Sequence, residues 1–398
     1  MKGFIPRSMK EMILMDWERY RVKFPMLLDK TYLLTSSLGA MPKEAHESLR
    51  RYTEIWESHG AHAWFEGDDG WFAVINHVKE LFANIIGAKK EEIAATYSIS
   101  SAISSVASAL EFGERNKVVM SELNFPTVSY IFRAHERHGA EVKFIRSPDG
   151  ISIPIDEYVT EIDETTLIVP ISHVLFVTGA IQNIHEIGKI AHENGAYILI
   201  DAYQSVGSIP IDVKKTKVDF LVCGTLKYLL GGPGIAFLYV NEDIVEDLYP
   251  TSVGWLADEE PFGPRWTKYD ITHPTPARDA RRFQYGTFSV PSAYAAKPGL
   301  EMIHEIGVSK IRERCIDLSQ YVVEEALKRN LTLKSPVNNE LRSSIVNIQV
   351  SQPDEVVKRL ETHNIFVDAR VGGIRVAPFF YNTKHEIDTL FSALDTIL

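Results

Sequence analysis

Two charged residues stand directly after apolar segments in the middle of the chain. Asp201 ends the segment AYILID, and Lys227 follows the segment DFLVCG, with the turn sequence GGPG close behind it. A lysine beside an apolar strand end is chemically interesting, because burial lowers its pKa and makes the amine a nucleophile toward aldehydes. Pyridoxal chemistry needs such a lysine, together with a carboxylate that keeps the pyridine nitrogen protonated. A surface lysine and a helix-capping aspartate would show the same spacing.

Two further segments carry groups that could bind anions. Residues 98–102, SISSA, precede the helix-like segment AISSVASAL, and backbone N–H groups at a helix start bind phosphate. Arg375 lies in GGIRVAPFFYN, within a strand pattern, where a guanidinium could hold a carboxylate by two parallel hydrogen bonds. Plain helix capping and a solvated arginine on a strand edge are the alternatives that these two patterns leave open.

The elements around these residues follow an alternating pattern. Apolar strand segments are KVVMSE, EVKFI, TLIVPIS, AYILID, DFLVCG and IAFLYV, and helical periodicity covers residues 44–57, 72–87, 127–138 and 184–195. Continuous apolar strands that alternate with helices predict an α/β fold with a mostly parallel sheet covered on both faces. Ligands of such sheets bind at the carboxyl ends of the strands, where Asp201 and Lys227 stand.

The amino-acid composition and pattern of the chain change after about residue 241. Residues 250–291 are rich in proline, glycine and aromatic residues, as expected for a long active-site loop or a subunit contact. One long helix is predicted over residues 292–329. Residues 342–398, with strands around SSIVNIQV and GIRVAP, predict a smaller α+β unit.

Composition limits the classes of function. The chain has 398 residues and a net charge of −11, with no long run of Lys or Arg, which argues against nucleic-acid and membrane-surface binding. No stretch reaches the roughly 18 apolar residues of a membrane span. Cys223 and Cys315 are two distant thiols that make neither a disulfide framework nor a zinc site. We therefore expect a cytoplasmic protein without a bound metal.

Five motifs together resemble the class V aminotransferase family, within the fold type I enzymes that use pyridoxal 5′-phosphate (PLP). They are TYSISSA, DAYQSVG, CGTLKYLLGGPG, QYGT and GIRVAPFFYNT, in family order and at family spacing, and the resemblance runs from about Tyr32 to the C-terminus. It implies an aspartate-aminotransferase-like fold with a mainly parallel seven-stranded sheet in a large PLP-binding domain, residues 28–270. Residues 271–398, with 1–27, would form a smaller α+β domain. It further implies a homodimer whose subunits share the active site.

The resemblance also implies a role for each site residue. Lys227 would form a Schiff base with the cofactor and then move a proton between the substrate Cα and the cofactor C4′. Asp201 would pair with the pyridine nitrogen, and Arg375 would hold the substrate α-carboxylate. The other cofactor contacts that it implies are Gln204 at the ring hydroxyl, Phe125 stacked on the ring, Ile99, Ser100 and Thr225 at the phosphate, and Thr287 at the phosphate of the other subunit.

Two more side chains are open to more than one interpretation. Trp255, in the long loop, is a candidate for the wall of the substrate pocket and could reach across the dimer. His173 could touch the cofactor, or it could be a buried histidine whose hydrogen bonds are satisfied.

Within the family, the sequence segments of this chain most resemble those of kynureninase. The similar segments are TSSLGAMPKEA, NFPTVSY, SHVLFVTG, GTLKYLLGG, VGWLA and IRVAPFFYN. Three positions depart, because kynureninase-type sequences have His, Tyr and Asp where this chain has Gln204, Leu226 and Val128. That His and Tyr help to set up hydrolytic Cβ–Cγ cleavage. Cysteine desulfurases need a nucleophilic cysteine before the carboxylate-binding arginine, and VDARVGG contains none.

We therefore expect an enzyme that acts on a small amino acid through an external aldimine, most simply a transaminase. The alternatives are a kynureninase-like hydrolase or lyase, an epimerase, and a non-catalytic protein of the same fold that only binds PLP.

Overall fold

The computed structural model describes residues 15–261 and 272–398 of the chain. Its strands are β1 (Thr31–Tyr32), β2 (Ile93–Thr96), β3 (Lys117–Ser121), β4 (Glu141–Ile145), β5 (Thr166–Ser172), β6 (Tyr197–Asp201), β7 (Phe220–Gly224), β8 (Ala236–Val240), β9 (Val346–Gln349), β10 (Ile365–Phe366), β11 (Asp368–Arg370) and β12 (Gly373–Val376). Its α-helices are α1 (Glu18–Arg21), α2 (Lys43–His59), α3 (Trp71–Ile86), α4 (Ile99–Ser108), α5 (Pro126–Ala134), α6 (Ile155–Glu161), α7 (Ile184–Glu193), α8 (Val213–Thr216), α9 (Val290–Ile306), α10 (Val308–Lys328), α11 (Pro353–Glu361) and α12 (Lys384–Ile397).

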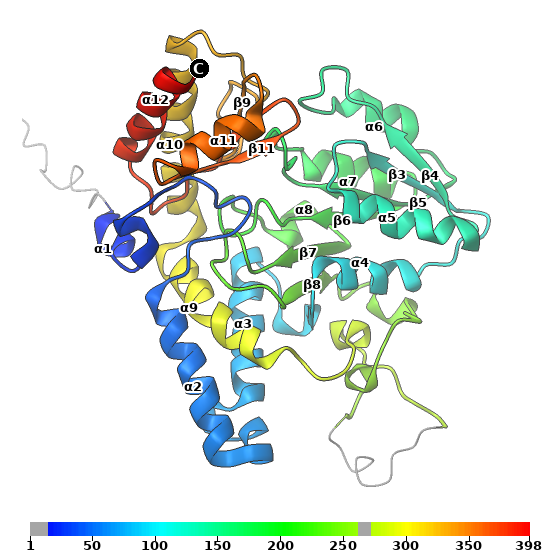
Figure 1. Cartoon of the computed structure of the whole chain (residues 1–398). Helices are drawn as coiled ribbons and strands as arrows, with labels where there is room; N and C mark the ends of the chain where they lie inside the picture. Colours follow the sequence, from blue (N-terminus) through cyan, green and yellow to red (C-terminus); the bar gives the residue numbers. More distant parts are fainter. Residues whose placement is uncertain (1–14, 262–271) are drawn as a thin grey trace, which may run out of the picture.

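A seven-stranded sheet forms the centre of the molecule, in the order β2-β8-β7-β6-β5-β3-β4 (Figure 1). Strands β7, β6, β5, β3 and β4 pair in parallel, and β8 pairs antiparallel with both β7 and β2. Strand β2 therefore runs in the same direction as the five parallel strands. This confirms the predicted mainly parallel seven-stranded sheet and the α/β fold class.

All six strand segments predicted between residues 117 and 240 are present in this sheet, as β3 to β8. The seventh strand, β2, was not predicted from the sequence. It is only four residues long, IAAT, and two of the four are alanines, which have little preference for strands. Its pairing with β8 and its complete burial, rather than its own sequence, place it in the sheet.

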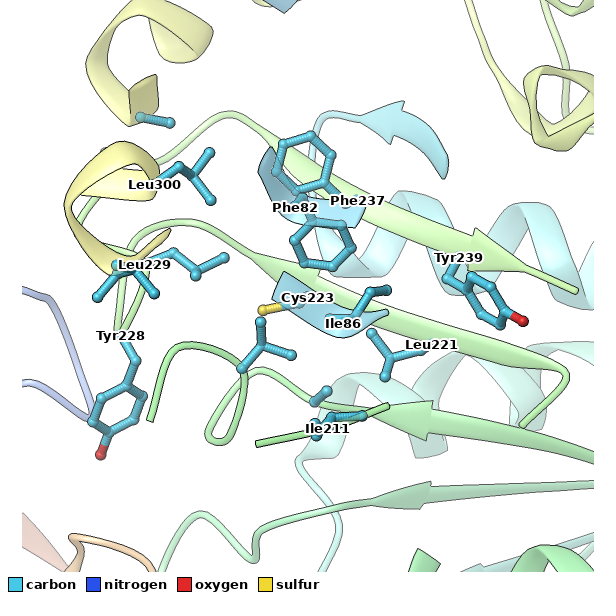
Figure 2. Close-up of a cluster of buried hydrophobic side chains, with 14 of the residues drawn as sticks. Phe82, Ile86, Ile211, Leu221, Cys223, Tyr228, Leu229, Phe237, Tyr239 and Leu300 are labelled. Carbon is cyan, nitrogen blue, oxygen red and sulfur yellow. The ribbon is translucent and has the colours of Figure 1, made fainter. Parts of the chain in front are cut away.

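Helices cover both faces of the sheet, which explains why its inner strands are largely apolar. Helices α4 and α5 pack on one face, and α3, α7 and α9 contribute to the core on the other. Figure 2 shows part of the core on the face covered by α3, α7 and α9. There Phe82 of α3 stacks on Phe237 of β8, with ring centroids 4.6 Å apart. All five residues of both β7 and β8 are buried.

The single helix predicted over residues 292–329 is in fact two helices, α9 and α10. They are separated at Gly307, whose φ of +85° is a conformation that glycine adopts far more readily than other residues. Helix α9 packs along α2 and α3, whereas α10 turns toward the C-terminal part of the chain (Figure 1). The helical periodicity on both sides of Gly307 concealed this break.

A smaller unit contains the antiparallel sheet β11-β12-β9, with α10, α11 and α12 packed on it (Figure 1). The first half of α10 belongs to the core of the large sheet, and its second half belongs to the core of this smaller unit. Strand β1 pairs with β10, so residues 31–32 lie beside residues 365–366 in this unit.

The predicted boundary between residues 270 and 271, like residues 1–14 of the predicted small domain, lies outside the described residues. The two-domain division at this boundary therefore stays a prediction. Of the helices in the described ranges, none is long and apolar enough to cross a membrane.

Candidate active site

The candidate site lies at the edge of the large sheet where the parallel strands end. Asp201 is the last residue of β6, Lys227 follows β7 by three residues, and α4 begins three residues after β2. This is the edge at which parallel α/β sheets bind their ligands. The fold thus brings to one edge three features that the sequence had suggested separately.

Lys227 begins a tight turn whose backbone is held in place. The Leu230 N–H donates to the Lys227 carbonyl at 3.1 Å, and Leu230 itself is buried with a φ of +58°. A positive φ is costly for a branched residue and persists only where the surroundings impose it.

Three glycines from distant parts of the chain supply those surroundings. A Cβ atom on Gly39, Gly207 or Gly299 would collide with a backbone carbonyl of residues 227–229. The Gly39 N–H also donates to the Leu226 carbonyl at 2.7 Å. Tyr228 and Leu229 are both buried (Figure 2), and the Tyr228 ring makes an edge contact with Phe379. The position of Lys227 is therefore fixed by backbone packing on several sides.

The Lys227 amine is bordered by two aromatic rings. Its Nζ lies 4.2 Å from the ring centroid of Tyr203 and 5.8 Å from that of Phe125. Burial lowers the pKa of Lys227 to about 8; the charge of Asp201 opposes this shift, and nearby Arg375 lowers the pKa further. Within the described ranges, Lys227 forms no ion pair. A larger fraction of the amine is therefore unprotonated at neutral pH than in an exposed lysine.

Asp201 is almost completely buried, with 5% of its surface exposed. One of its oxygens, Oδ1, accepts the Tyr203 N–H at 3.0 Å. Burial raises the pKa of Asp201, whereas this hydrogen bond and the charge of Lys227 act in the opposite direction. A buried carboxylate that lacks its own cation is suited to pair with a protonated ring nitrogen.

Gln204 has one satisfied and one unsatisfied amide atom. Its Nε2 donates to the Ser36 carbonyl at 3.0 Å, whereas Oε1 is buried and has no hydrogen-bond partner in the described part of the chain. A buried amide oxygen without a partner costs free energy, which a bound group with a hydroxyl would recover. The ring hydroxyl of PLP is such a group.

The start of α4 offers backbone donors. The Ser98 side chain caps the helix by accepting the Ser101 N–H at 3.1 Å, which leaves the N–H groups of Ile99 and Ser100 without an acceptor inside the helix. The Ser100 hydroxyl is hydrogen-bonded to the Thr127 hydroxyl at 2.7 Å. These donors and the positive end of the helix dipole suit a phosphate.

Thr225 is buried inside the glycine-rich turn, and its hydroxyl donates to the Gly232 carbonyl at 2.9 Å. Its predicted contact with a phosphate stays a prediction.

Taken together, these groups fit PLP. A half-buried amine of lowered pKa, a buried carboxylate, a buried amide oxygen without a partner and the first N–H groups of a helix match the cofactor's aldehyde, ring nitrogen, hydroxyl and phosphate in turn.

Arg375 is already engaged in the protein. Its Nε and Nη2 bind both oxygens of Asp368 at 2.9 and 2.6 Å, Nη1 donates to the Phe176 carbonyl at 2.6 Å, and Nη2 also donates to the Ser37 hydroxyl at 2.7 Å. Only 2% of its side chain is exposed. A substrate carboxylate that binds Arg375 must therefore share it with Asp368.

Thr287 and Trp255 lie on the surface close to this edge of the sheet. The Tyr97 hydroxyl donates to the Thr287 carbonyl at 2.5 Å, and both residues are exposed. Trp255 lies against Gly286 and is 44% exposed. Phe125, also 44% exposed, makes an edge contact with Phe176. The roles predicted for Thr287, Trp255 and Phe125 remain predictions.

His173 follows β5 directly and is buried, and its backbone N–H donates to the Asp201 carbonyl at 2.9 Å. Burial and nearby Arg312 lower the pKa of His173 to about 4, and its Nδ1 has no partner among the described residues. Its hydrogen bonds are therefore not fully satisfied within the described residues, and a contact with the cofactor stays a prediction.

Several residues of the site had escaped sequence analysis. They are Tyr203 beside the lysine, Asp368 on the arginine, Thr127 at the start of α4, and the loop residues Ser36, Ser37 and Gly39. The only local signal for the loop was its composition, TSSLGAMP, just before the helix predicted from residue 44. The others are recognised only through contacts between distant segments.

Comparisons with known proteins agree with this arrangement. The family model described as aminotransferase class-V matches residues 31–390. An uncharacterized aminotransferase, YcbU, of Bacillus subtilis is 34% identical over 93% of this chain and 95% of its own length. A kynureninase of Shouchella clausii is 29% identical over 96% of this chain and 91% of its own length.

Solved structures share the fold. The apo structure of a cysteine desulfurase from Thermococcus onnurineus NA1 superposes with a TM-score of 0.84 and 23% identity, over 96% of this chain and 97% of the other. A C-DES mutant with glycine linked to the PLP cofactor gives a TM-score of 0.85 and 20% identity, over 94% and 98% of the two chains. At these identities the likeness concerns the fold alone. With a family model that spans most of its length, the chain belongs to the class V aminotransferase family and is a PLP-dependent enzyme of fold type I.

Proposed function

We propose that this enzyme is an aminotransferase that acts on a small amino acid, with Lys227 as the residue that binds the cofactor. The observation that carries the proposal is the Lys227 amine, which is held in a fixed turn and has its pKa lowered to about 8. Asp201 and the arginines Arg370 and Arg375 are close enough to influence that pKa. An amino group, a carboxylate and guanidinium groups thus lie near one another at this edge of the sheet, a combination that suits an amino-acid substrate.

When bound, PLP supplies an electron sink for the electron pair left at the substrate Cα. Asp201 would keep the ring nitrogen protonated, because a buried carboxylate favours a proton near it. The Lys227 amine would take the proton from the substrate Cα and hold it for return, which requires an amine that is neutral near the working pH. Arg375 would orient the substrate carboxylate, and the first N–H groups of α4 would hold the phosphate.

A kynureninase-like hydrolase is the second candidate, because several kynureninases are 29–30% identical to this chain over most of its length. The positions that depart from that family argue against it. Val128 is completely buried and apolar, and Gln204 is tied to the Ser36 carbonyl. Neither offers an acid or a base near the substrate. Lyase and epimerase reactions remain further alternatives, since they need the same lysine and carboxylate.

The proposed working unit is a homodimer in the cytoplasm. The support for a dimer is the exposed group formed by Tyr97, Thr287 and Trp255 beside the start of α4, from which Thr287 could reach the phosphate of a second copy. Both cysteines are free and buried, in keeping with a reducing compartment.

A panel of amino acids with and without a keto-acid acceptor tests the reaction. An aminotransferase forms new amino acid only when the acceptor is present, and the Lys227→Ala variant forms none. Alanine and an aromatic product from kynurenine, without any acceptor, would instead establish the hydrolase.

A further inference from the structure

Arg370 lies next to Arg375 on the hairpin of β11 and β12. Asp368 faces Arg375 in the register of the hairpin, and Arg370, two residues along β11, is on the same face. The Nη2 atoms of both arginines contact one oxygen of Asp368, Oδ2, at 2.9 Å for Arg370 and 2.6 Å for Arg375. Besides burial, the charges of both arginines lower the pKa of Lys227. Two guanidinium groups therefore lie together within electrostatic reach of the reactive amine.

The hydrogen bonds of Arg375 leave it little capacity for a further ligand. A guanidinium has five N–H groups, and four of those of Arg375 donate to protein atoms, namely both oxygens of Asp368, the Ser37 hydroxyl and the Phe176 carbonyl. Its side chain is only 2% exposed. A carboxylate from outside therefore cannot form two parallel hydrogen bonds with Arg375 unless Asp368 leaves.

Arg370 has the capacity that Arg375 lacks. Its side chain is 38% exposed, and its polar contacts within the described ranges are the ion pair with Asp368 and one hydrogen bond, from Nη1 to the Ala369 carbonyl at 3.0 Å. Most of its N–H groups are thus open to a ligand. Because the two arginines share the single carboxylate of Asp368, this carboxylate balances only one of their two charges. A planar guanidinium in this position suits a second carboxylate.

We propose that Arg370 is the main ligand of the substrate α-carboxylate, and that Arg375 assists with its remaining Nη1 N–H group. The inference rests on the proposed function, because it assumes an amino-acid substrate beside Lys227. In this arrangement Asp368 is a positioning residue, since its carboxylate holds both guanidinium groups at the same edge of the site. The substrate then binds without separating the largely buried pair of Asp368 and Arg375, which would cost free energy.

Two small reagents that differ by a carboxylate test this inference. Aminooxyacetate and O-methylhydroxylamine both react with PLP held on a lysine. The reagent nitrogen forms the double bond to the PLP aldehyde carbon, the bond to Lys227 breaks, and the lysine amine takes up the two protons of the reagent nitrogen. Only aminooxyacetate carries a carboxylate. The ratio of the two rate constants, compared with the ratio for free PLP, therefore measures how strongly the enzyme binds this group.

Stopped-flow absorbance of each holoenzyme gives both rate constants. We expect Arg370→Gln to lower the rate constant for aminooxyacetate about tenfold, because an ion pair with the carboxylate is lost, and to leave that for O-methylhydroxylamine within about twofold. Arg370→Lys should lie between the two, since it keeps the charge but loses the planar fork. Arg133→Gln is the matched control, because Arg133 is a 58% exposed arginine that pairs with Glu136; it should keep both rate constants.

Three results would overturn the inference. A wild-type enzyme with no preference for aminooxyacetate beyond that of free PLP, or a folded Arg370→Gln variant with the wild-type ratio, shows that Arg370 does not bind the carboxylate. Rate constants that fall equally for both reagents show that Arg370 only supports the structure of the site. Arg370→Met serves instead if far-ultraviolet circular dichroism shows that the glutamine variant does not fold. Failure of the proposed function has a different signature, because an enzyme without PLP on Lys227 gives no absorbance change with either reagent.

Discussion

At the scale of single residues, the chemistry depends on how the protein changes ordinary side chains. Burial lowers the pKa of Lys227 to about 8 and raises the pKa of Asp201, and each charge partly opposes the shift of the other. Neither effect needs an unusual residue. Both arise because two charged groups lie at the end of a sheet whose strands are covered on both faces.

The lowered pKa of Lys227 predicts the pH dependence of cofactor capture. Only the unprotonated amine attacks an aldehyde, so the rate at which apoenzyme captures PLP should rise with pH and level off above about 8. Asp201→Asn removes the charge that opposes the shift, and should move the midpoint to lower pH. Stopped-flow absorbance measures these rates. A profile that keeps rising toward pH 10, the range of an exposed lysine, would contradict the assignment.

His173 should make the protein less stable in acid. Its pKa is about 4 in the folded chain and about 6.5 in an unfolded one, so the unfolded state takes up a proton first as the pH falls. The free energy of unfolding should therefore decrease between pH 6.5 and pH 4. In His173→Gln, the slope of the unfolding free energy against pH in this range should be smaller by the equivalent of about one proton. Urea unfolding at several pH values tests this. Equal slopes in both proteins would show that the pKa of His173 is the same in the folded and unfolded states.

At the scale of elements, the turn that carries Lys227 depends on close backbone contacts. Gly39 is the clearest test, because its φ is not positive and the nearest atoms that a Cβ atom there would meet belong to the Lys227 carbonyl and Leu230. Gly39→Ala should lower the free energy of unfolding by roughly 1–3 kcal/mol and also weaken PLP binding, since the lysine must shift.

The matched control is Gly113→Ala, because a Cβ atom on Gly113 has nothing within 4 Å. We expect this control to be neutral or slightly stabilising, as the unfolded chain loses conformational freedom. Thermal unfolding and PLP titration of both variants measure the predicted differences in stability and in PLP binding. Equal behaviour of the two variants would show that the turn is not held by close packing against Gly39.

The hairpin of β11 and β12 holds a largely buried ion pair between Asp368 and Arg375, and Arg370 lies 2.9 Å from the same carboxylate. Removing only Arg375 leaves this carboxylate with Arg370 as its remaining cation, so Arg375→Met should cost less than the roughly 3–5 kcal/mol of a fully buried pair that loses one partner. The double variant Arg375→Met with Asp368→Leu should recover much of that loss. Urea denaturation of the single and double variants measures the difference, and equal losses in both would show that the pair is not coupled.

At the scale of the whole molecule, the sequence predicts the elements better than their contacts. Strands β3 and β5 to β8 were predicted because they are buried along almost their whole length and are therefore largely apolar, whereas β4, at the edge of the sheet, shows an alternating burial pattern. Strand β2 and the break at Gly307 escaped prediction, since an IAAT segment and a single glycine carry weak local signals.

The site residues likewise divide into those that local sequence patterns predict and those that only tertiary contacts reveal. Lys227, Asp201 and the start of α4 follow directly from local patterns, because each ends or begins an element. The loop with Ser37 and the residue Asp368 join the site only through tertiary contacts, such as the hydrogen bond of 2.6 Å between them. Residues far apart in the chain share no local pattern, so periodicity could not have paired them.

A shared active site in a dimer predicts complementation between two inactive variants. Thr287→Asp should be inactive, because the added charge repels the phosphate of PLP, and Lys227→Ala lacks the reactive amine. If Thr287 serves the other subunit, a mixed dimer has one site that is intact, and mixing should restore activity. Activity assays after subunit exchange test this. No recovery in a mixture that forms mixed dimers would place Thr287 in the site of its own chain.

The measurement that tests the central claim most directly is borohydride reduction of the purified enzyme with PLP, followed by peptide mass spectrometry. We predict that the reduced cofactor is attached to Lys227, and that the Lys227→Ala variant carries none at a site near Asp201. Attachment of the cofactor to another lysine, or a Lys227→Ala variant that is labelled as fully as the wild type, would contradict the assignment.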